Sequence, residues 1–246
     1  MSEPFFRTLA RDAASRYPPR DRFARHFAFG KLTRDPAFAH ILRHGLIPAG
    51  ARVLDLGSGQ GVLAALLVAA RGRHARGDWP ASWPVPPNPA CITGIDLVSR
   101  DVERANHVSR SREAGDRETD IRFVAGDIRT TPFDPADTVV ILDVLHYIDY
   151  DAQAEVLRRV RAALGAGGVL LLRVGDESPR LRFRITLAVD RFVMALRGHR
   201  FARLYCKPLA RWRQELEALG FRVAATPMSA GTPFANALLV ARYDGP

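Results

Sequence analysis

The segment Val53-Leu54-Asp55-Leu56-Gly57-Ser58-Gly59-Gln60-Gly61 decides the fold of this 246-residue chain. A β-branched and leucine-rich run ends in three glycines at alternate positions, and an apolar run, Val62-Leu63-Ala64-Ala65-Leu66-Leu67-Val68, follows directly. The pattern predicts a strand, a tight turn and a helix, because glycines let the backbone turn sharply and let a ligand approach without an intervening Cβ. The helix would direct its free N–H groups and its positive dipole end at that ligand. Such a turn is typical of the nucleotide-facing edge of a doubly wound α/β fold.

The spacing of the glycines narrows the choice of ligand. Counted from Gly57, the last position of a G-x-G-x-x-G dinucleotide fingerprint falls on Val62; counted from Gly59, the looser form ends on Ala64 and leaves a dinucleotide open. The longer pattern D-x-G-x-G-x-G, from Asp55 to Gly61, resembles motif I of the class I S-adenosylmethionine (SAM) methyltransferases. The resemblance implies SAM as cofactor and an α/β fold: a single domain with a doubly wound, mostly parallel, seven-stranded sheet whose last strand is antiparallel.

Acids follow the next two predicted strands as well. The second strand, 91–96, ends in Asp96, which in a doubly wound fold can accept hydrogen bonds from both ribose hydroxyls. The third strand, 121–125, leads into Gly126-Asp127-Ile128, which resembles the family segment that reads the adenine edge. One acid after one strand is commonly a cap or turn residue, but three after successive strands indicate a site. The resemblance implies these SAM contacts: Asp55, Gly57, Ser58, Gly59, Gly61, Asp96, Leu97, Asp127, Ile128 and Leu142.

The fourth predicted strand leads to the candidate catalytic residues. Residues 138–142 form a continuous apolar run, as a parallel strand buried on both faces requires. Asp143-Val144-Leu145-His146-Tyr147 follows, where the resemblance implies that the methyl group meets its acceptor. A hydroxyl or amine acceptor must lose a proton, and His146 is the preferred base, with Tyr147 and Asp143 as alternatives. A histidine that only shapes the pocket wall fits the sequence equally well.

The remaining segments complete the predicted domain. A helix over 151–164 that stops at Gly165, a strand over 169–174 and a closing pair of strands over 221–227 and 235–241 make up the sheet. Residues 51–246 are expected to form the methyltransferase domain. Residues 72–90 contain five prolines and two tryptophans, so we expect an irregular insertion whose tryptophans pack on the body, or alternatively border the active site.

The first 50 residues are expected to form an N-terminal helical cap. Apolar side chains recur at helical spacing, and Tyr17-Pro18-Pro19 and Asp35-Pro36 divide the segment. In the family resembled, such a leading segment often folds over the cofactor and substrate. Its apolar residues are expected mainly in the core: Phe5, Phe6, Leu9, Ala13, Phe23, Phe27, Phe38, Ile41 and Leu42.

A second helical segment, with cationic positions around an apolar stripe, lies between the fifth and sixth predicted strands. We expect residues 176–207 to form a helical lid over the acceptor, while residues 180–197 could alternatively lie on a membrane surface. The residues expected to border the acceptor are His199, Arg200, Arg203, Tyr205 and Lys207.

The composition of the chain limits its possible partners, its metal or disulfide chemistry and its compartment. The chain carries 36 basic and 26 acidic residues, a net charge of +10 that can attract nucleic acid or anionic lipid, or can reflect an arginine-rich solvated surface. Cys91 and Cys206 give neither a disulfide framework nor a metal spacing. With no apolar leader or membrane span in the sequence, we expect a cytoplasmic enzyme, of bacterial origin by its arginine content.

The absence of two motifs narrows the choice of enzyme class and substrate. The N/D-P-P-Y/F segment of nucleic-acid adenine methyltransferases is absent after the fourth predicted strand, and no Y-x-x-x-K pair of a short-chain dehydrogenase accompanies the glycine turn. The first hypothesis is therefore methyl transfer to a small molecule: a phenolic hydroxyl, a carboxylate or a lipid-like metabolite. RNA methylation is the second, motivated by the charge, and a non-catalytic SAM-binding protein is the third. The sequence does not set the oligomeric state.

Overall fold

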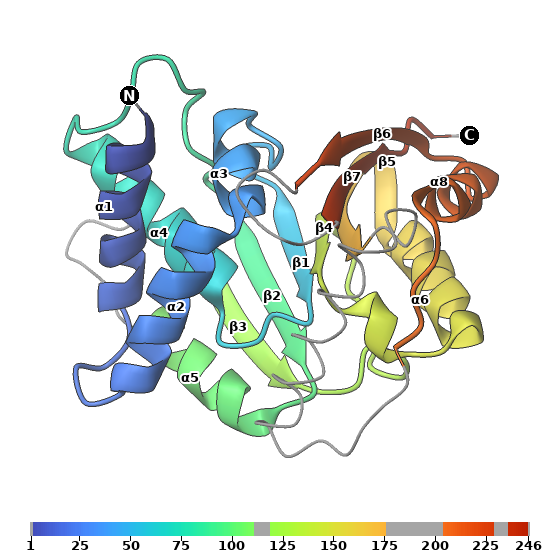
Figure 1. Cartoon of the computed structure of the whole chain (residues 1–246), viewed down its shortest axis with the longest axis horizontal. Helices are drawn as coiled ribbons and strands as arrows, with labels where there is room; N and C mark the ends of the chain where they lie inside the picture. The colour runs from blue at the N-terminus through green and yellow to red at the C-terminus, as the bar shows by residue number, and fades with distance from the viewer. Residues whose placement is uncertain (1, 111–118, 176–203, 229–235, 246) are drawn as a thin grey trace. The chain divides into compact units, whose positions relative to one another are not determined.

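The computed structural model describes residues 2–110, 119–175, 204–228 and 236–245 (Figure 1). Contacts divide the chain into two compact units, residues 1–138 and residues 139–246. The predicted lid and membrane-facing segment fall almost wholly outside the described residues, as do His199, Arg200 and Arg203. Of the helices in the described parts, none has both the length and the hydrophobicity that a membrane crossing requires.

Seven strands pair in the order β3-β2-β1-β4-β5-β7-β6. Strands β1, β2 and β3 run parallel, whereas β7 is antiparallel to both β5 and β6. This confirms the predicted doubly wound, mostly parallel sheet with an antiparallel last strand. The strands are β1 (Arg52–Leu56), β2 (Cys91–Asp96), β3 (Asp120–Ala125), β4 (Ala136–Leu142), β5 (Leu164–Gly175), β6 (Arg222–Pro227) and β7 (Asn236–Arg242).

Five helices accompany β1, β2 and β3 in the first unit. Helix α4 is buried on every side from Val62 to Ala70, because α1 packs on it and the sheet lies beneath it. Its apolar sequence suits that position, since a helix without a polar face needs cover all round (Figure 1). The helices are α1 (Ser2–Ser15), α2 (Arg22–Arg34), α3 (Pro36–Arg43), α4 (Val62–Ala75) and α5 (Ser99–Arg110).

The N-terminal segment is divided into helices at the prolines, as the sequence predicts. Side chains of Asp21 and Asp35 accept hydrogen bonds from the N–H groups of Ala24 (3.0 Å) and Ala37 (3.1 Å), and so start α2 and α3. Most of the predicted core residues are buried, but Phe23 is 59% exposed. Its ring lies beside that of Phe27, and the guanidinium of Arg104 lies 4.9 Å from its centroid.

The proline-rich insertion begins later than predicted. Residues 72–75 contain no proline and extend α4 to Ala75, so only the chain after this point is irregular up to β2. The rings of Phe5, Trp79 and Trp83 pack edge to face, with centroids 5.5 to 5.6 Å apart. The insertion therefore packs its tryptophans against α1.

The second unit holds most of β4, together with β5, β6 and β7. Helix α6 (Tyr150–Ala163) packs on β5, and α8 (Leu209–Ala218) packs on β6 and β7. The predicted helix end at Gly165 is wrong, because α6 ends at Ala163 and β5 already begins at Leu164. Gly167, at φ 79°, bends the start of this long strand, and its N–H donates to the carbonyl of Tyr243 (2.7 Å).

Candidate functional site

The glycine turn between β1 and α4 is shaped for a ligand. Gly57, Gly59 and Gly61 have φ of 75°, 54° and 73°, the left-handed region that glycine adopts without strain. A Cβ at Gly61 would come within 2.7 Å of Phe123, whereas one at Gly59 would meet nothing within 4 Å. The turn therefore packs tightly at its last glycine and is open at its middle one.

Most backbone N–H groups of this turn are used within the protein. Those of Gly57 and Ser58 donate to the carbonyl of Ile95 (2.8 and 3.2 Å), and that of Gly61 donates to Ser58 (2.9 Å). Within the described residues, the N–H groups of Gln60 and Val62 have no acceptor. These two N–H groups remain for a ligand, so the predicted contacts through Gly57 and Ser58 would be to atoms other than their amides.

Asp96 lies beside the turn, as predicted. Its Oδ2 accepts a hydrogen bond from the N–H of Gly59 (2.8 Å), and its Oδ1 accepts one from Val98 (2.9 Å). A carboxylate offers about four lone-pair positions, so it can accept several hydrogen bonds at once. Leu97, the next residue, is 63% exposed and presents an apolar surface next to that carboxylate.

Asp55 is the buried acid of the turn. It lies at the end of β1, opposite Gly94 of β2 in the parallel register. Burial, together with the negative charge of Asp96, raises the pKa of its carboxyl to about 7. The neighbouring carboxyl groups of Asp55 and Asp96 suit a cationic ligand, because a positive charge would favour the ionised form of both.

Asp127 follows β3 but is already engaged. Both of its carboxylate oxygens accept hydrogen bonds from the side chain of Arg129, and its Oδ1 also accepts one from the N–H of Arg129 (2.9 Å). The side-chain hydrogen bonds from Arg129 hold the pKa of this carboxyl below its usual range. Ile128 is buried. The N–H of Gly126 donates to the Asp96 carbonyl (2.9 Å), which joins the ends of β2 and β3.

Sequence reasoning did not identify the residues that support the turn from behind. A Cβ at Gly94 would meet Phe123 at 2.3 Å and the Oγ of Ser58 at 2.8 Å, so only glycine fits there. A glycine inside a strand is the signal for such a close approach. From the N-terminal segment, the hydroxyl of Tyr17 donates to the carbonyl of Gln60 (2.8 Å), a contact that no sequence motif indicates.

In the second unit, β4 ends at the half-buried Leu142 and Asp143 follows in a left-handed conformation, with φ 61°. The carboxylate of Asp143 lies 2.9 Å from the Nε of the buried Arg173, which belongs to β5. The N–H of Asp143 donates to the carbonyl of the same arginine (3.3 Å). This acid is therefore held in an ion pair with a buried cation.

His146 and Tyr147 lie on a short 3-10 helix, η1 (Leu145–Tyr147), immediately after Asp143 and Val144. Both residues are half-buried, and their ring centroids are 4.1 Å apart. The carbonyl of His146 accepts a hydrogen bond from the N–H of Tyr205 (2.9 Å). The chain that returns to the described region at residue 204 thus pairs with the turn that carries the candidate base.

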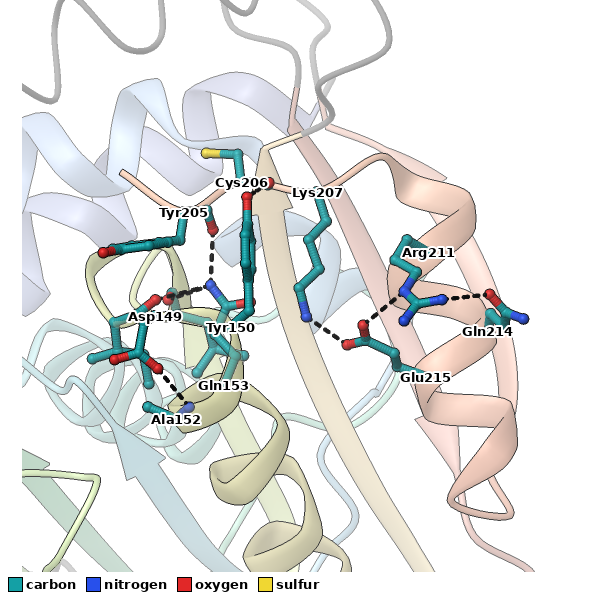
Figure 2. Close-up of polar contacts among 12 residues, drawn as sticks. Asp149, Tyr150, Ala152, Gln153, Tyr205, Cys206, Lys207, Arg211, Gln214 and Glu215 are labelled. Carbon is teal, nitrogen blue, oxygen red and sulfur yellow. Dashed lines mark hydrogen bonds and ion pairs between the residues drawn. The ribbon is translucent and has the colours of Figure 1, made fainter. Parts of the chain in front are cut away.

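Gln153 holds these two segments together (Figure 2). Its Nε2, fully buried in the first turn of α6, donates to the carbonyls of Leu145 (3.0 Å), Ile148 (3.1 Å) and Tyr205 (2.8 Å). The hydroxyl of Tyr150 donates to the carbonyl of Cys206 (3.0 Å). Asp149, whose Oδ1 accepts from the N–H of Ala152 (2.8 Å), caps α6 at the same place.

Lys207 anchors the other end of this returning segment (Figure 2). Its buried Nζ lies 2.7 Å from the Oε2 of Glu215 and 4.6 Å from the ring centroid of Trp212, both on α8. Arg211 reaches the second oxygen of Glu215 (3.1 Å). Lys207 is therefore a structural residue. Tyr205, in contrast, pairs through its backbone with the turn that carries His146.

Many of the arginines form ion pairs. The pairs among the described residues include Arg52–Asp137, Arg73–Asp12, Arg104–Asp21, Arg122–Asp134 and Arg222–Asp244. Such pairing agrees with arginines that lie on a solvated surface and stabilise the fold. The described residues also contain no group of three or more His, Cys, Asp or Glu that could hold a metal ion.

A comparison with protein families matches residues 24–226 to a model described as "Methyltransferase domain". The matched region contains the glycine turn, Asp96, Asp127 and His146. It begins inside α2 and ends in β6.

Individual relatives match over shorter stretches. A carboxy-S-adenosyl-L-methionine synthase from Chromohalobacter salexigens is 35% identical over 123 residues, which cover 50% of this chain and 39% of the relative. The acetylserotonin O-methyltransferase of Mus musculus is 35% identical over 127 residues, 52% of this chain and 29% of the relative. The matches thus span well under half the length of these curated relatives. Among solved structures, the magnesium protoporphyrin IX methyltransferase of Synechocystis PCC 6803 with bound SAH aligns with a TM-score of 0.58 and 19% identity, over 98% of this chain and 97% of that one.

Proposed function

The chain belongs to the methyltransferase-domain family, the class I SAM-dependent methyltransferases, and on that premise we propose that it transfers the methyl group of SAM to a small molecule. SAM is the cofactor of this family. The relative that methylates acetylserotonin supports a small-molecule acceptor. The proposed acceptor group is a phenolic hydroxyl, with a carboxylate or a lipid-like metabolite as the wider class.

The residues around the glycine turn fit SAM. Asp96, which lies beside the turn through its hydrogen bond from the N–H of Gly59, would accept hydrogen bonds from the two ribose hydroxyls. Leu97 would cover one face of the adenine, and Asp127 with Ile128 would border its edge. Asp55 would lie near the positively charged methionine end. The remaining predicted contacts, Gly57, Ser58, Gly59, Gly61 and Leu142, would line the same cofactor.

His146 is the proposed general base. Bound SAM supplies an activated methyl group, so the protein has to align the acceptor oxygen, remove its proton and exclude water. The observation that carries this assignment is the ion pair between Asp143 and Arg173, which occupies the competing carboxylate with a buried cation. Tyr147, whose ring lies against His146, would orient the acceptor.

We propose that residues 1–50 act as a helical cap, residues 51–246 as the methyltransferase domain, and residues 176–207 as a lid over the acceptor. Tyr205, at the end of this lid, is hydrogen-bonded to the turn that carries His146, which gives the lid a fixed anchor point.

RNA is the second candidate acceptor, because the chain carries a net charge of +10. The ion pairs of the described arginines reduce the charge that is available to a phosphate backbone. Contact of residues 180–197 with a membrane and SAM binding without catalysis are the remaining alternatives.

The deciding experiment is incubation of the protein with methyl-labelled SAM and an extract of its source cells. The products are separated into organic-soluble, RNA and protein fractions, with Asp96→Ala as the inactive control. Label in the organic-soluble fraction, absent with the control, is the expected result. Label in the RNA fraction would show that RNA, and not a small molecule, is the substrate. The absence of label from every fraction would contradict catalysis.

A further inference from the structure

We infer that Tyr17 is a positioning residue for the SAM site, which fixes the glycine turn and thereby couples cofactor binding to the docking of the N-terminal helices. The inference concerns cofactor binding alone and does not depend on the nature of the acceptor. It starts from the hydrogen bond that Tyr17 donates to the carbonyl of Gln60 (2.8 Å). Both residues are 1% exposed, so water cannot replace either partner.

The bond acts on the peptide that joins Gln60 to Gly61. A peptide group is planar, so holding its carbonyl also fixes the direction of the N–H of Gly61 on its other side. That N–H donates to Ser58 (2.9 Å) and closes the turn from which α4 starts. The turn contains three glycines with positive φ, whose freedom must be restricted before a ligand can bind without an entropic cost.

The other long-range hydrogen bonds to the turn come from one strand. Among the hydrogen bonds of the described chain, the long-range ones to this turn go to Ile95 and Asp96 at the end of β2, and to Tyr17. Among the described residues, Tyr17 is thus the one through which the N-terminal segment is hydrogen-bonded to the cofactor turn.

Tyr17 is itself held firmly. Four residues later, Asp21 caps α2 and pairs with Arg104 of α5 (2.9 Å), which also pairs with the buried Asp101 (3.2 Å). On the other side, Asp12 of α1 pairs with Arg73 of α4 (2.5 Å). The α1–α2 connection is therefore tied to the two helices that begin at the SAM-facing turns. Burial raises the pKa of the Tyr17 phenol, with a further contribution from Asp101, so its hydroxyl remains a donor.

The test is Tyr17→Phe, which removes the hydroxyl and keeps the ring. We expect the dissociation constant for SAM, measured by titration calorimetry, to rise about 5- to 20-fold, within the usual range of coupling between sites. Tyr150→Phe is the matched control, because it also removes a tyrosine-to-carbonyl hydrogen bond, the one to Cys206 (3.0 Å), but in the second unit. The control should bind SAM as the wild type does. A folded Tyr17→Phe protein with wild-type affinity would overturn the inference and leave Tyr17 a merely structural role.

Hydrogen exchange on the wild type provides a test that needs no variant. Coupling is reciprocal, so SAM should slow amide exchange in α1 and in residues 16–21. Slowing confined to the glycine turn and β2, with no effect on the N-terminal segment, would contradict the coupling even if Tyr17→Phe failed to fold.

Discussion

The Nε of Arg173 lies 2.9 Å from the carboxylate of Asp143, and the N–H of Asp143 donates to the carbonyl of the same arginine. The pair links the residue after β4 to a residue near the end of β5. Arg173 is only 6% exposed, so the carboxylate of Asp143, in place of water, balances the charge of its guanidinium.

Asp143→Asn should therefore destabilise the protein by about 3 kcal/mol, the lower end of the cost of breaking a buried pair. Asparagine tolerates the positive φ of 61°, so the change isolates the charge. The control is Asp137→Asn, which removes an exposed pair with Arg52 and should therefore cost much less stability. Urea unfolding measures both, and equal losses for the two variants would contradict a special role for the Arg173 pair.

Asp55 should make the stability of the SAM-free protein fall with rising pH. Its folded pKa of about 7 lies above the ordinary 3.8, so folding disfavours the ionised form. The cost is absent below about pH 4, grows as the pH rises and is complete above about pH 7. Asp55→Asn should remove it, so the variant gains stability relative to the wild type between pH 5 and pH 8. Urea unfolding at several pH values would show this gain, and a constant difference would refute it.

SAM affinity should depend on the same carboxyl. The cofactor is cationic and favours ionised Asp55, so the wild-type affinity should rise from about pH 5.5 to pH 7.5. Asp55→Asn should bind more weakly and lose most of this rise. Calorimetric titration across that range measures both, and a wild-type affinity independent of pH would place Asp55 outside the cofactor site.

Asp96→Ala should abolish measurable SAM binding. The change removes the proposed acceptor of the ribose hydroxyls and also the acceptor for the N–H of Gly59 (2.8 Å). Hydrogen bonds to a charged group contribute about 1.5–3 kcal/mol each, so the expected loss is at least 100-fold. Asp127→Asn is the comparison: because Arg129 already occupies that carboxylate, we expect a loss below about 10-fold. Titration calorimetry measures both affinities. A larger loss for Asp127→Asn than for Asp96→Ala would show that Asp127, and not Asp96, is the main carboxylate contact of SAM.

His146→Gln should leave SAM affinity within about twofold and reduce turnover by about 10²- to 10⁴-fold, the usual contribution of a general base. Glutamine keeps a polar side chain of similar length but cannot accept the proton. The measurement is label transfer to the acceptor fraction, with calorimetry for the cofactor. Unchanged turnover would show that His146 only shapes the wall of the site. Loss of SAM binding would show that His146 contacts the cofactor instead of acting as the base.

Gln153→Leu should destabilise the protein by about 2–3 kcal/mol, because the buried carbonyl of Leu145 and the partly buried carbonyls of Ile148 and Tyr205 lose their shared donor. Gln214, which accepts an exposed hydrogen bond from Arg211 (3.2 Å), provides the control, and Gln214→Leu should change stability by about 0.5 kcal/mol or less. Thermal and urea unfolding compare the two. A loss of similar size in both would show that the buried amide does not hold the His146 turn.

Local patterns predicted the elements that depend on local physics. The strand that ends at Asp96 and the glycine turn follow from β-branched runs and from glycines, and the structure has them at the predicted residues. The end of α6 was misplaced because Gly165 reads as a helix stop, whereas β5 extends back to Leu164 through pairing with distant residues.

The candidate site was predictable where a motif or the rule for strand ends applies, as for the glycine turn and Asp96. Contacts such as Tyr17 with Gln60, or Asp143 with Arg173, join residues that are far apart in the chain and belong to no motif. The raised pKa of Asp55 likewise arises from burial and from a neighbouring strand, which no single stretch of sequence reveals.

The three tryptophans give each unit its own optical probe. Trp79 and Trp83 pack on Phe5 in the first unit, while the fully buried Trp212 lies in α8 of the second. Fluorescence of a Trp212→Phe protein would follow the first unit alone, and a protein with Trp79→Phe and Trp83→Phe would follow the second. Whether the two halves of the chain melt in one transition or in two can therefore be determined without any added label.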